Sequence, residues 1–293
     1  MPSSPLHAPV LEWYAGNARD LPWRAPGTTA WGVLVSEVML QQTPVARVEP
    51  VYQSWLERWP TPAALAREPA GEAVRAWGRL GYPRRALRLH ALATEVVARH
   101  DGRLPTSYAG LRALPGVGDY TAAAVASFAH GARHAVLDTN VRRVLARAVG
   151  GSERPAPSVT AAERARAEGL LPDEPAVAAR WAVAVMELGA LVCTARSPRC
   201  GGCPVAARCA WRLAGAPAYE GPVRRVQQFA GTDRQVRGLL MAVLRDRDPG
   251  DDPVGAAELA AVWPDDTQRD RALATLLADG LLIEDPAATY RLP

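Results

Sequence analysis

The chain has 293 residues, of which 48% are hydrophobic and 22% are charged, and its formal net charge is +4. This composition excludes a disordered chain, and the length is sufficient for two folded domains. Residues 1–9 lack a secretory signal pattern, and no run approaches the 18 apolar residues of a membrane span, so we expect a cytoplasmic protein.

The basic residues are unusual in kind and uneven in distribution. All 34 of them are arginines, so no lysine is available to form a Schiff base. Residues 1–220 hold 25 arginines against 18 acidic residues, whereas residues 221–293 hold 9 against 12. The positive excess of the larger part suits a polyanionic partner. The alternative is an ordinary basic protein with an acidic end.

Apolar residues recur at helical spacing through most of the chain, and Gly and Pro mark the connections. We expect a loop at 150–158 and a linker at 214–231. After the linker come three more helical stretches (234–245, 256–262 and 267–277) and two short strands (281–284 and 289–292). Their order resembles a winged helix. The helices expected before the linker cover residues 10–13, 32–40, 51–59, 73–77, 86–97, 107–113, 120–128, 141–149 and 176–192.

Four cysteines lie within 17 residues, with the spacing C-x6-C-x2-C-x5-C. Disulfides are not expected without a secretory signal. Zinc is one alternative, but its common sites pair two close cysteine hooks, and here only the central pair is close. A four-thiolate iron–sulfur cluster fits one short loop better. The predicted metal ligands are Cys193, Cys200, Cys203 and Cys209.

A hairpin motif precedes the helix that is expected from Tyr120. Its residues Leu114, Gly116 and Gly118 resemble the DNA-binding turn of a helix–hairpin–helix, in which backbone N–H groups face a phosphate. An ordinary helix connection is the alternative. Twenty residues later, Asp138 stands where an apolar segment turns into a helix, and an N-cap is its simplest interpretation.

These features together resemble the MutY-type adenine DNA glycosylases of the helix–hairpin–helix base-excision superfamily, which contain an iron–sulfur cluster. The resemblance covers about residues 10–212. The matching motifs are LPWR at 21–24, SEVMLQQT at 36–43, LGY at 80–82, LPGVG at 114–118, LDTNVRRV at 137–144, and MELGA at 186–190 running into Cys193.

The resemblance implies chemical roles for two carboxylates. Glu37 would be the general acid that protonates the purine ring, and Asp138 would stabilise the oxocarbenium-like sugar. Tyr120 and Asn140 would orient these groups. Because adenine inside a duplex is unreachable, the base must be flipped out, and Gln42 and Tyr82 match the family's wedges. The remaining predicted DNA contacts are Trp23 and Arg24 near the base pocket, the three hairpin residues, and Arg142 and Arg143.

The fold implied is all-α, with a two-lobed glycosylase body, an iron–sulfur loop and a small winged-helix-like domain. The six-helix lobe would span 31–135. The other lobe would join 1–30 to 136–213, the linker would be 214–231, and the last domain 232–293. DNA would lie between the lobes, where Glu37 faces Asp138.

The function implied is hydrolysis of the N-glycosidic bond of adenine opposite 8-oxoguanine or guanine in base excision repair. We expect a monofunctional enzyme, because Tyr120 stands where a lyase would carry lysine. We also expect a [4Fe–4S] cluster, double-stranded DNA as partner, a monomer, and a bacterial protein associated with the nucleoid. The alternatives are a glycosylase for mismatched or oxidised pyrimidines, and a non-catalytic iron–sulfur DNA-binding regulator.

Three departures from the family pattern affect these expectations. The aspartate segment has Thr139 where many members have glycine. Val183 stands where members often place a polar residue that contacts adenine. The family's usual C-terminal domain, which recognises the lesion, is not recognisable after the linker, so the sequence does not say how 8-oxoguanine would be sensed.

Overall fold

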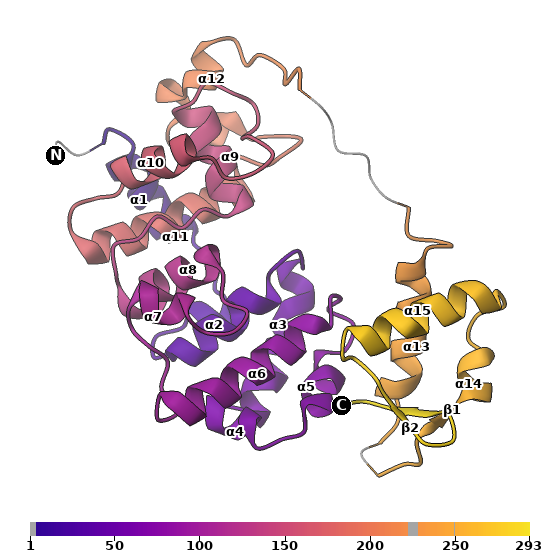
Figure 1. Ribbon diagram of the computed structural model, residues 1–293. Helices are drawn as coiled ribbons and strands as arrows, with labels where there is room; N and C mark the ends of the chain where they lie inside the picture. The colour runs from indigo at the N-terminus through magenta and orange to yellow at the C-terminus, as the bar shows by residue number, and fades with distance from the viewer. Residues whose placement is uncertain (1–3, 222–227, 249) are drawn as a thin grey trace. The chain divides into compact units, whose positions relative to one another are not determined.

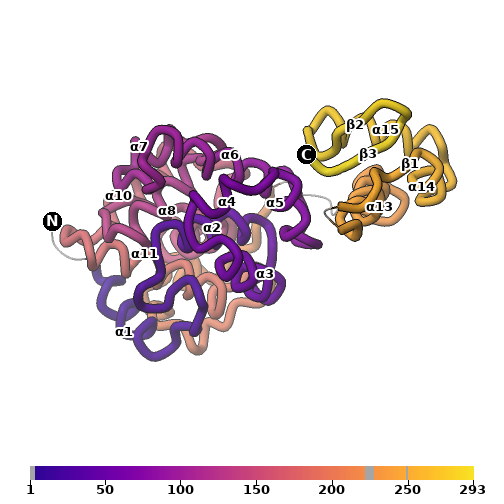
Figure 2. The backbone as a smooth tube through the Cα atoms, turned by 90° about the horizontal axis from the view of Figure 1, so that it is seen from below, coloured from indigo at the N-terminus to yellow at the C-terminus, as the bar shows by residue number. Residues whose placement is uncertain are grey.

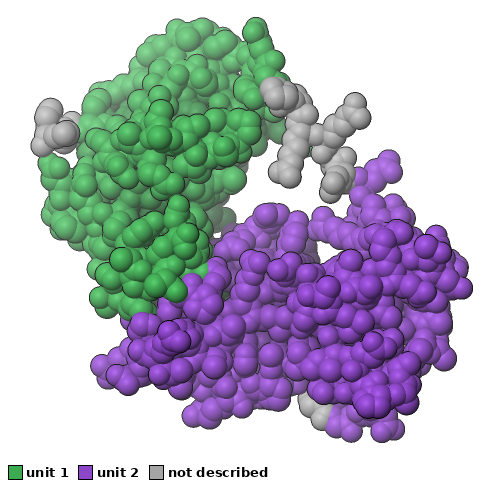
Figure 3. All heavy atoms as spheres, in the orientation of Figure 1, with its two compact units in different colours: residues 1–37, 105–113, 117–222 green, residues 38–104, 114–116, 223–293 purple. Residues whose placement is uncertain are grey.

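The computed structural model describes residues 4–221, 228–248 and 250–293. Figure 1 shows the order of its helices and strands. The chain divides into two compact units (Figure 3). Unit 1 comprises residues 1–37, 105–113 and 117–222, and unit 2 comprises 38–104, 114–116 and 223–293. Part of the linker expected at 214–231 lies outside the described residues.

Unit 1 is built around the long helix α11 (Pro175–Leu191), which packs against α1 (His7–Asn17), α8 (Asp119–His130) and α9 (Thr139–Ala148). Apolar residues such as Val10, Val144, Trp181 and Leu188 form its core. The same unit holds most of α2 (Ala30–Met39). Its short helices are η1 (Pro22–Arg24), α7 (Tyr108–Arg112), α10 (Ala161–Gly169), η2 (Cys200–Gly202), η3 (Ala206–Arg208) and α12 (Ala210–Leu213).

Unit 2 contains four helices from the middle of the chain: α3 (Val45–Arg58), α4 (Pro62–Ala66), α5 (Ala70–Trp77) and α6 (Arg84–Arg99). Helix α6 packs on α4 and α5, and α3 on α5. Three indole rings fix the contact between α3 and α5, because Trp55 packs edge-on against Trp59 at 4.7 Å and against Trp77 at 5.7 Å.

The last part of unit 2 is a small module formed by the C-terminal end of the chain (Figures 1 and 2). Its elements are α13 (Asp233–Arg245), β1 (Val254–Gly255), α14 (Ala256–Ala260), α15 (Asp266–Ala278), β2 (Ile283–Asp285) and β3 (Thr289–Arg291). The strands form an antiparallel sheet in the order β1-β3-β2, with Val254 opposite Tyr290 and Glu284 also opposite Tyr290. Helices α13 and α15 pack together.

The expected helical fold is confirmed, and the differences have local causes. Helix α4 was not expected, although Thr61 caps it and Pro62 occupies its first position. Helix α10 was not expected either, although Thr160 and Glu163 form a capping box at its start. The two expected C-terminal strands are present as β2 and β3. Strand β1 was not expected, because its two residues are too few for an alternating pattern. Among the described residues, no helix has the length and apolarity to cross a membrane.

Candidate functional site

Glu37 lies near the end of α2 and is only 5% exposed. The Tyr120 hydroxyl, from the first turn of α8, donates a hydrogen bond of 2.6 Å to its Oε2. Burial is the main cause that raises the pKa of Glu37, and the Asp138 charge adds to it, whereas the Tyr120 hydrogen bond and Arg24 oppose the shift; the net pKa is about 7. At neutral pH about half of the Glu37 carboxyls therefore hold a proton.

Asp138 is both the N-cap of α9 and a second carboxylate whose charge acts on Glu37. Its Oδ1 accepts the Val141 N–H at 2.6 Å, and its Oδ2 accepts the Asn140 amide at 2.8 Å. Burial raises the pKa of Asp138, and these hydrogen bonds oppose that shift. Because both oxygens accept hydrogen bonds, the ionised form is the one that the site supports. The N-cap geometry also fixes the direction of the carboxylate.

Tyr120 keeps its proton at neutral pH. Burial and the neighbouring Glu37 raise the pKa of its phenol well above the ordinary value of 10. It is therefore a permanent hydrogen-bond donor to Glu37 Oε2, which leaves Oε1 as the oxygen whose proton is available for transfer. The structure thus brings together all four predicted catalytic residues, Glu37, Tyr120, Asp138 and Asn140, within unit 1.

A second buried glutamate organises the N-terminal side of this unit. Glu187 of α11 is fully buried and accepts two hydrogen bonds from the Arg19 guanidinium, at 2.7 and 2.8 Å, and one from Arg24 at 3.0 Å. Burial alone would raise its pKa, but these bonds lower it to about 2. Nη1 of Arg24 is buried and has no hydrogen-bond partner among the described residues. Trp23 beside it is buried.

The predicted hairpin forms the turn between α7 and α8. Leu114 is buried, and Gly116 has a φ of +77°, which is the left-handed region that favours glycine. Gly118 is the N-cap of α8, so it lies at the helix N-terminus whose free N–H groups suit a phosphate.

The two predicted wedges share a backbone feature. Gln42 and Tyr82 are exposed non-glycine residues with φ of +56° and +49°. Such conformations are sparsely populated and need support from their surroundings.

Arg142 and Arg143 were expected to contact DNA, and both have their guanidinium groups bonded to protein. Arg142 pairs with Glu163 at 2.8 Å. Arg143 donates to Asn140 Oδ1 at 2.8 Å, to the Gly189 carbonyl at 2.8 Å and to the Cys193 carbonyl at 2.7 Å. Their DNA contacts stay a prediction, and Arg143 gains a second role, because it joins the Asp138 pocket to the first cysteine of the loop.

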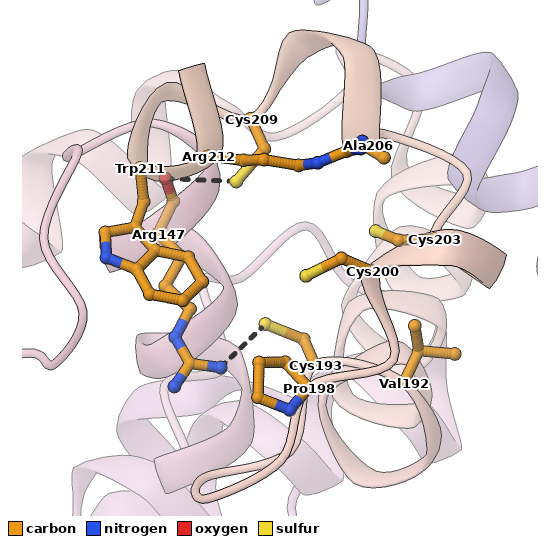
Figure 4. Close-up of a pocket in the computed structure, with 10 residues that line it drawn as sticks. All are labelled: Arg147, Val192, Cys193, Pro198, Cys200, Cys203, Ala206, Cys209, Trp211 and Arg212. Atoms are coloured by element: carbon orange, nitrogen blue, oxygen red, sulfur yellow. Dashed lines mark hydrogen bonds between the residues drawn. The ribbon is translucent and has the colours of Figure 1, made fainter. Parts of the chain in front are cut away.

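The four cysteines line one pocket, and Figure 4 shows their Sγ atoms directed into the same space. Arg147 of α9 is buried there, with Nη1 3.4 Å from Cys193 Sγ and donating to the Thr194 carbonyl at 2.7 Å. Trp211 stacks on this guanidinium at 4.9 Å. Four converging sulfurs with a cation beside them fit an iron–sulfur cluster, because its thiolate ligands bring negative charge. When bound, the cluster would tie residues 193–209 to α9.

Sequence patterns had not identified Arg19, Arg147 or the role of Glu187, because their partners lie far away in the chain. Gly189 had a usable signal, since it stands in the MELGA motif. A Cβ at this position would lie 2.7 Å from the Cβ of Asn140, so only glycine lets α11 approach the start of α9 this closely.

Comparisons with known proteins show the family of the chain. Residues 35–168 match the model of the HhH-GPD superfamily base excision DNA repair proteins, and residues 193–209 match the iron–sulfur binding domain of endonuclease III. The chain is 53% identical over 286 residues to an adenine DNA glycosylase of Mycobacterium tuberculosis, covering 97% of this chain and 92% of that one. It is 41% identical over 208 residues to the human adenine DNA glycosylase, covering 68% of this chain and 38% of that protein.

Among solved structures, a thermostable thymine-DNA glycosylase superposes with a TM-score of 0.64 at 28% identity, over 71% of this chain and 94% of that chain. The match of residues 193–209 to the iron–sulfur domain confirms the expected cofactor, a [4Fe–4S] cluster of the endonuclease III type. The carboxylate pocket, the cluster loop and this similarity lead to one conclusion: the chain is a base-excision DNA glycosylase and belongs to the MutY-type adenine DNA glycosylases.

Proposed function

We propose that this enzyme hydrolyses the N-glycosidic bond of adenine mispaired with 8-oxoguanine or guanine. The observation that carries the proposal is the Glu37–Tyr120–Asp138 arrangement, in which one buried carboxyl has a pKa of about 7 and the other accepts two hydrogen bonds. Two carboxyl groups in different environments are the usual basis for dividing acid and stabilising roles. The mycobacterial relatives named adenine DNA glycosylase support adenine as the target.

The residues would act in a defined order. Glu37 donates its proton to the purine ring, so adenine leaves as a neutral base rather than as a poor anionic leaving group. Asp138, held by Asn140 and Val141, stabilises the positive charge that develops on the sugar. Water then completes the hydrolysis and leaves an abasic site.

The rest of the protein would hold DNA in place for this chemistry. The hairpin around Gly116 and Gly118 would bind the phosphate backbone, and Gln42 and Tyr82 would fill the space left by the flipped adenine. Trp23 and Arg24 would line the base pocket. The cluster loop carries three exposed arginines, Arg196, Arg199 and Arg208, that suit the same backbone. We infer a monomer that works on nucleoid DNA in the cytoplasm.

We also propose that bond cleavage stops at the abasic site. Strand cutting by this superfamily needs an amine that attacks C1′ and forms a Schiff base, and the chain contains no lysine. Borohydride added during turnover should therefore trap no protein–DNA adduct, and the strand should stay intact until alkali is added. A trapped adduct would show that the amine of the chain terminus attacks the sugar, and it would overturn the monofunctional assignment.

The sequence did not indicate which residues recognise the base opposite the adenine. We propose that residues 232–293, a winged-helix-like module after the linker 214–231, contribute to its recognition. Within unit 2 the Arg234 guanidinium of α13 lies 5.2 Å from the centre of the Tyr82 ring, which supports a link between the module and a wedge. The division of the glycosylase body into two lobes stays a proposal, with residues 31–135 in one lobe and residues 1–30 and 136–213 in the other.

One assay tests the function. Single-turnover excision is measured on duplexes that carry A:8-oxoguanine, A:G, T:G or U:G, and alkali reveals the abasic site. We expect cleavage at adenine only. Preferred cleavage of T:G or U:G would favour the alternative function, a glycosylase for pyrimidines. The chain is 36% identical over 200 residues to a Pyrobaculum relative named thymine/uracil-DNA glycosylase. No cleavage of any duplex by iron-loaded protein would favour the non-catalytic regulator.

A matched pair of variants tests the C-terminal module. Arg234→Ala removes the contact with Tyr82, whereas Arg291→Ala removes the ion pair with Asp285, which lies within the β2–β3 hairpin. We expect only Arg234→Ala to lower the ratio of A:8-oxoguanine to A:G excision rates. An unchanged ratio in both variants would assign the module to another task, such as partner docking.

A further inference from the structure

Two turns of unit 2 carry the wedge residues, and both turns are connected to one buried arginine. The first turn follows α2 and contains Gln42, and the second precedes α6 and contains Tyr82. Tyr82 is 46% exposed. Both residues adopt left-handed backbone conformations.

Arg85, in the first turn of α6, is 6% exposed and makes five hydrogen bonds to these turns and to the end of α2 that precedes the first of them. Its Nη1 donates to the carbonyls of Val38, Met39 and Gln41, at 2.8, 3.0 and 2.7 Å. Two of these carbonyls end α2, where no helical partner remains. The third belongs to the residue before the first wedge.

The other nitrogen of the same guanidinium reaches the second turn. Nη2 of Arg85 donates to the Gly81 carbonyl at 3.0 Å, and Gly81 directly precedes Tyr82. It also donates to the Thr43 hydroxyl at 3.0 Å, and that hydroxyl is 3.3 Å from the Leu80 carbonyl. The guanidinium lies 5.5 Å from the centre of the Tyr82 ring as well. Backbone on both turns is therefore bonded to one planar group.

We propose that Arg85 is a positioning residue that fixes the two wedges in register with each other, so that base flipping depends on it although it does not contact the reacting atoms. The inference rests on the proposed function, because it takes Gln42 and Tyr82 as wedges. Burial lowers the pKa of Arg85 to about 10, so the group remains charged at neutral pH. Lysine cannot replace it, because an ammonium group lacks the fork that serves two turns at once.

The test separates flipping from chemistry by changing the substrate. Arg85→Met and Arg85→Lys are compared with wild type on adenine opposite guanine, and on adenine opposite a stable abasic analogue, where the unpaired base leaves the stack at low cost. We expect a loss of about 10- to 100-fold in the single-turnover rate on the A:G pair, the size of effect that a displaced positioning group causes. On the unpaired adenine the loss should be several-fold smaller.

Arg133→Met is the matched control. Arg133 also donates to several carbonyls, those of Pro172 and Leu171 among them, but all of these partners belong to unit 1. It should lower both rates equally or not at all. Equal losses on both substrates for Arg85→Lys would overturn the proposal and assign Arg85 to fold or chemistry. If wild type excised adenine from neither substrate, the proposed function would fail, which is a different result.

A double-mutant cycle covers the case in which the Arg85 variants do not fold. Gln42→Ala, Tyr82→Ala and the double variant are measured with Arg85 intact. If Arg85 positions both wedges together, the losses in rate on the A:G pair should be non-additive, because the two wedges act as one unit. Losses that multiply independently would overturn the proposal.

Discussion

Glu37 near the end of α2 and Glu187 in α11 are both buried glutamates of unit 1, and the charge of Arg24 affects both, yet their pKa values shift in opposite directions. Glu187 has two arginines as direct partners, and its pKa falls to about 2. Glu37 has a neutral phenol and a second carboxylate beside it, and its pKa rises to about 7. Burial is common to both, so the neighbouring donors decide which carboxyl keeps a proton.

The difference explains how unit 1 can contain both a structural carboxylate, Glu187, and the proposed proton donor, Glu37. A fully paired buried carboxylate stays ionised, and breaking the pair is costly, whereas a buried carboxyl without a cationic partner has a raised pKa and can exchange a proton near neutral pH. The N-terminal segment that carries Arg19 and Arg24 is tied to α11 by Glu187. Changing one glutamate or one of its partners at a time separates the two roles.

The largest effect is expected from Glu37→Gln. The substitution removes the proton donor and keeps the shape of the side chain, so single-turnover excision from A:G duplexes should fall by about 10²–10⁴-fold while duplex affinity stays close to wild type. Glu57→Gln, on the exposed face of α3, is the control and should change neither quantity. A Glu37→Gln enzyme that retained a tenth of the wild-type rate would rule out Glu37 as the general acid.

The next effect is on stability, in Glu187→Gln. Gln keeps the volume but leaves Arg19 and Arg24 without their counter-charge, so the free energy of unfolding at pH 7 should fall by about 3 kcal/mol. Because the pKa of Glu187 is lowered from its ordinary value of 4.5, its stabilisation is complete above about pH 4.5 and is lost as the pH falls toward 2.

The gap in unfolding free energy between wild type and Glu187→Gln should therefore narrow between pH 5 and pH 2, as measured by urea titration. Glu168→Gln, on the exposed surface of α10, is the control and should stay within about 0.5 kcal/mol of wild type at pH 7. A gap that did not change with pH would mean that packing, and not charge, is what Glu187 contributes.

The pH dependence of excision tests the other half of the comparison. Because a general acid must be protonated, the raised pKa of Glu37 predicts that the single-turnover rate falls about tenfold per pH unit above about pH 7. At acidic pH the rate should also fall where Asp138 gains a proton, because the neutral carboxyl no longer stabilises the positive sugar. Rates measured from pH 5 to pH 9, with circular dichroism at each pH to follow folding, check this. A rate that stayed constant between pH 7 and pH 9 would contradict the assignment.

Motifs were enough to select four residues that the structure links by hydrogen bonds and charge, because Glu37, Tyr120, Asp138 and Asn140 each stand in a short local pattern. Their catalytic roles stay a prediction. The helical fold also followed from apolar spacing. Motifs did not indicate the contacts that Arg85 and Arg143 make, or the Arg19–Glu187 pair, since each of these links segments that are tens of residues apart. The interpretation of Asp138 as an N-cap is confirmed, and it is compatible with the proposed catalytic role, because capping holds the carboxylate in place.

The smallest effect is expected from Tyr120→Phe, and it should also change the pH profile. The Tyr120 hydrogen bond lowers the pKa of Glu37, so losing it should raise that pKa and move the alkaline limb of the profile to higher pH. At the same time Glu37 loses the bond that orients it, so the maximal rate should fall by several-fold, less than in Glu37→Gln because the acid itself remains. Single-turnover rates from pH 6 to pH 9.5 on A:G duplexes measure both quantities. Since Phe leaves the ring and its packing in place, a limb that moved to lower pH would show that Tyr120 does not act on Glu37 through this hydrogen bond.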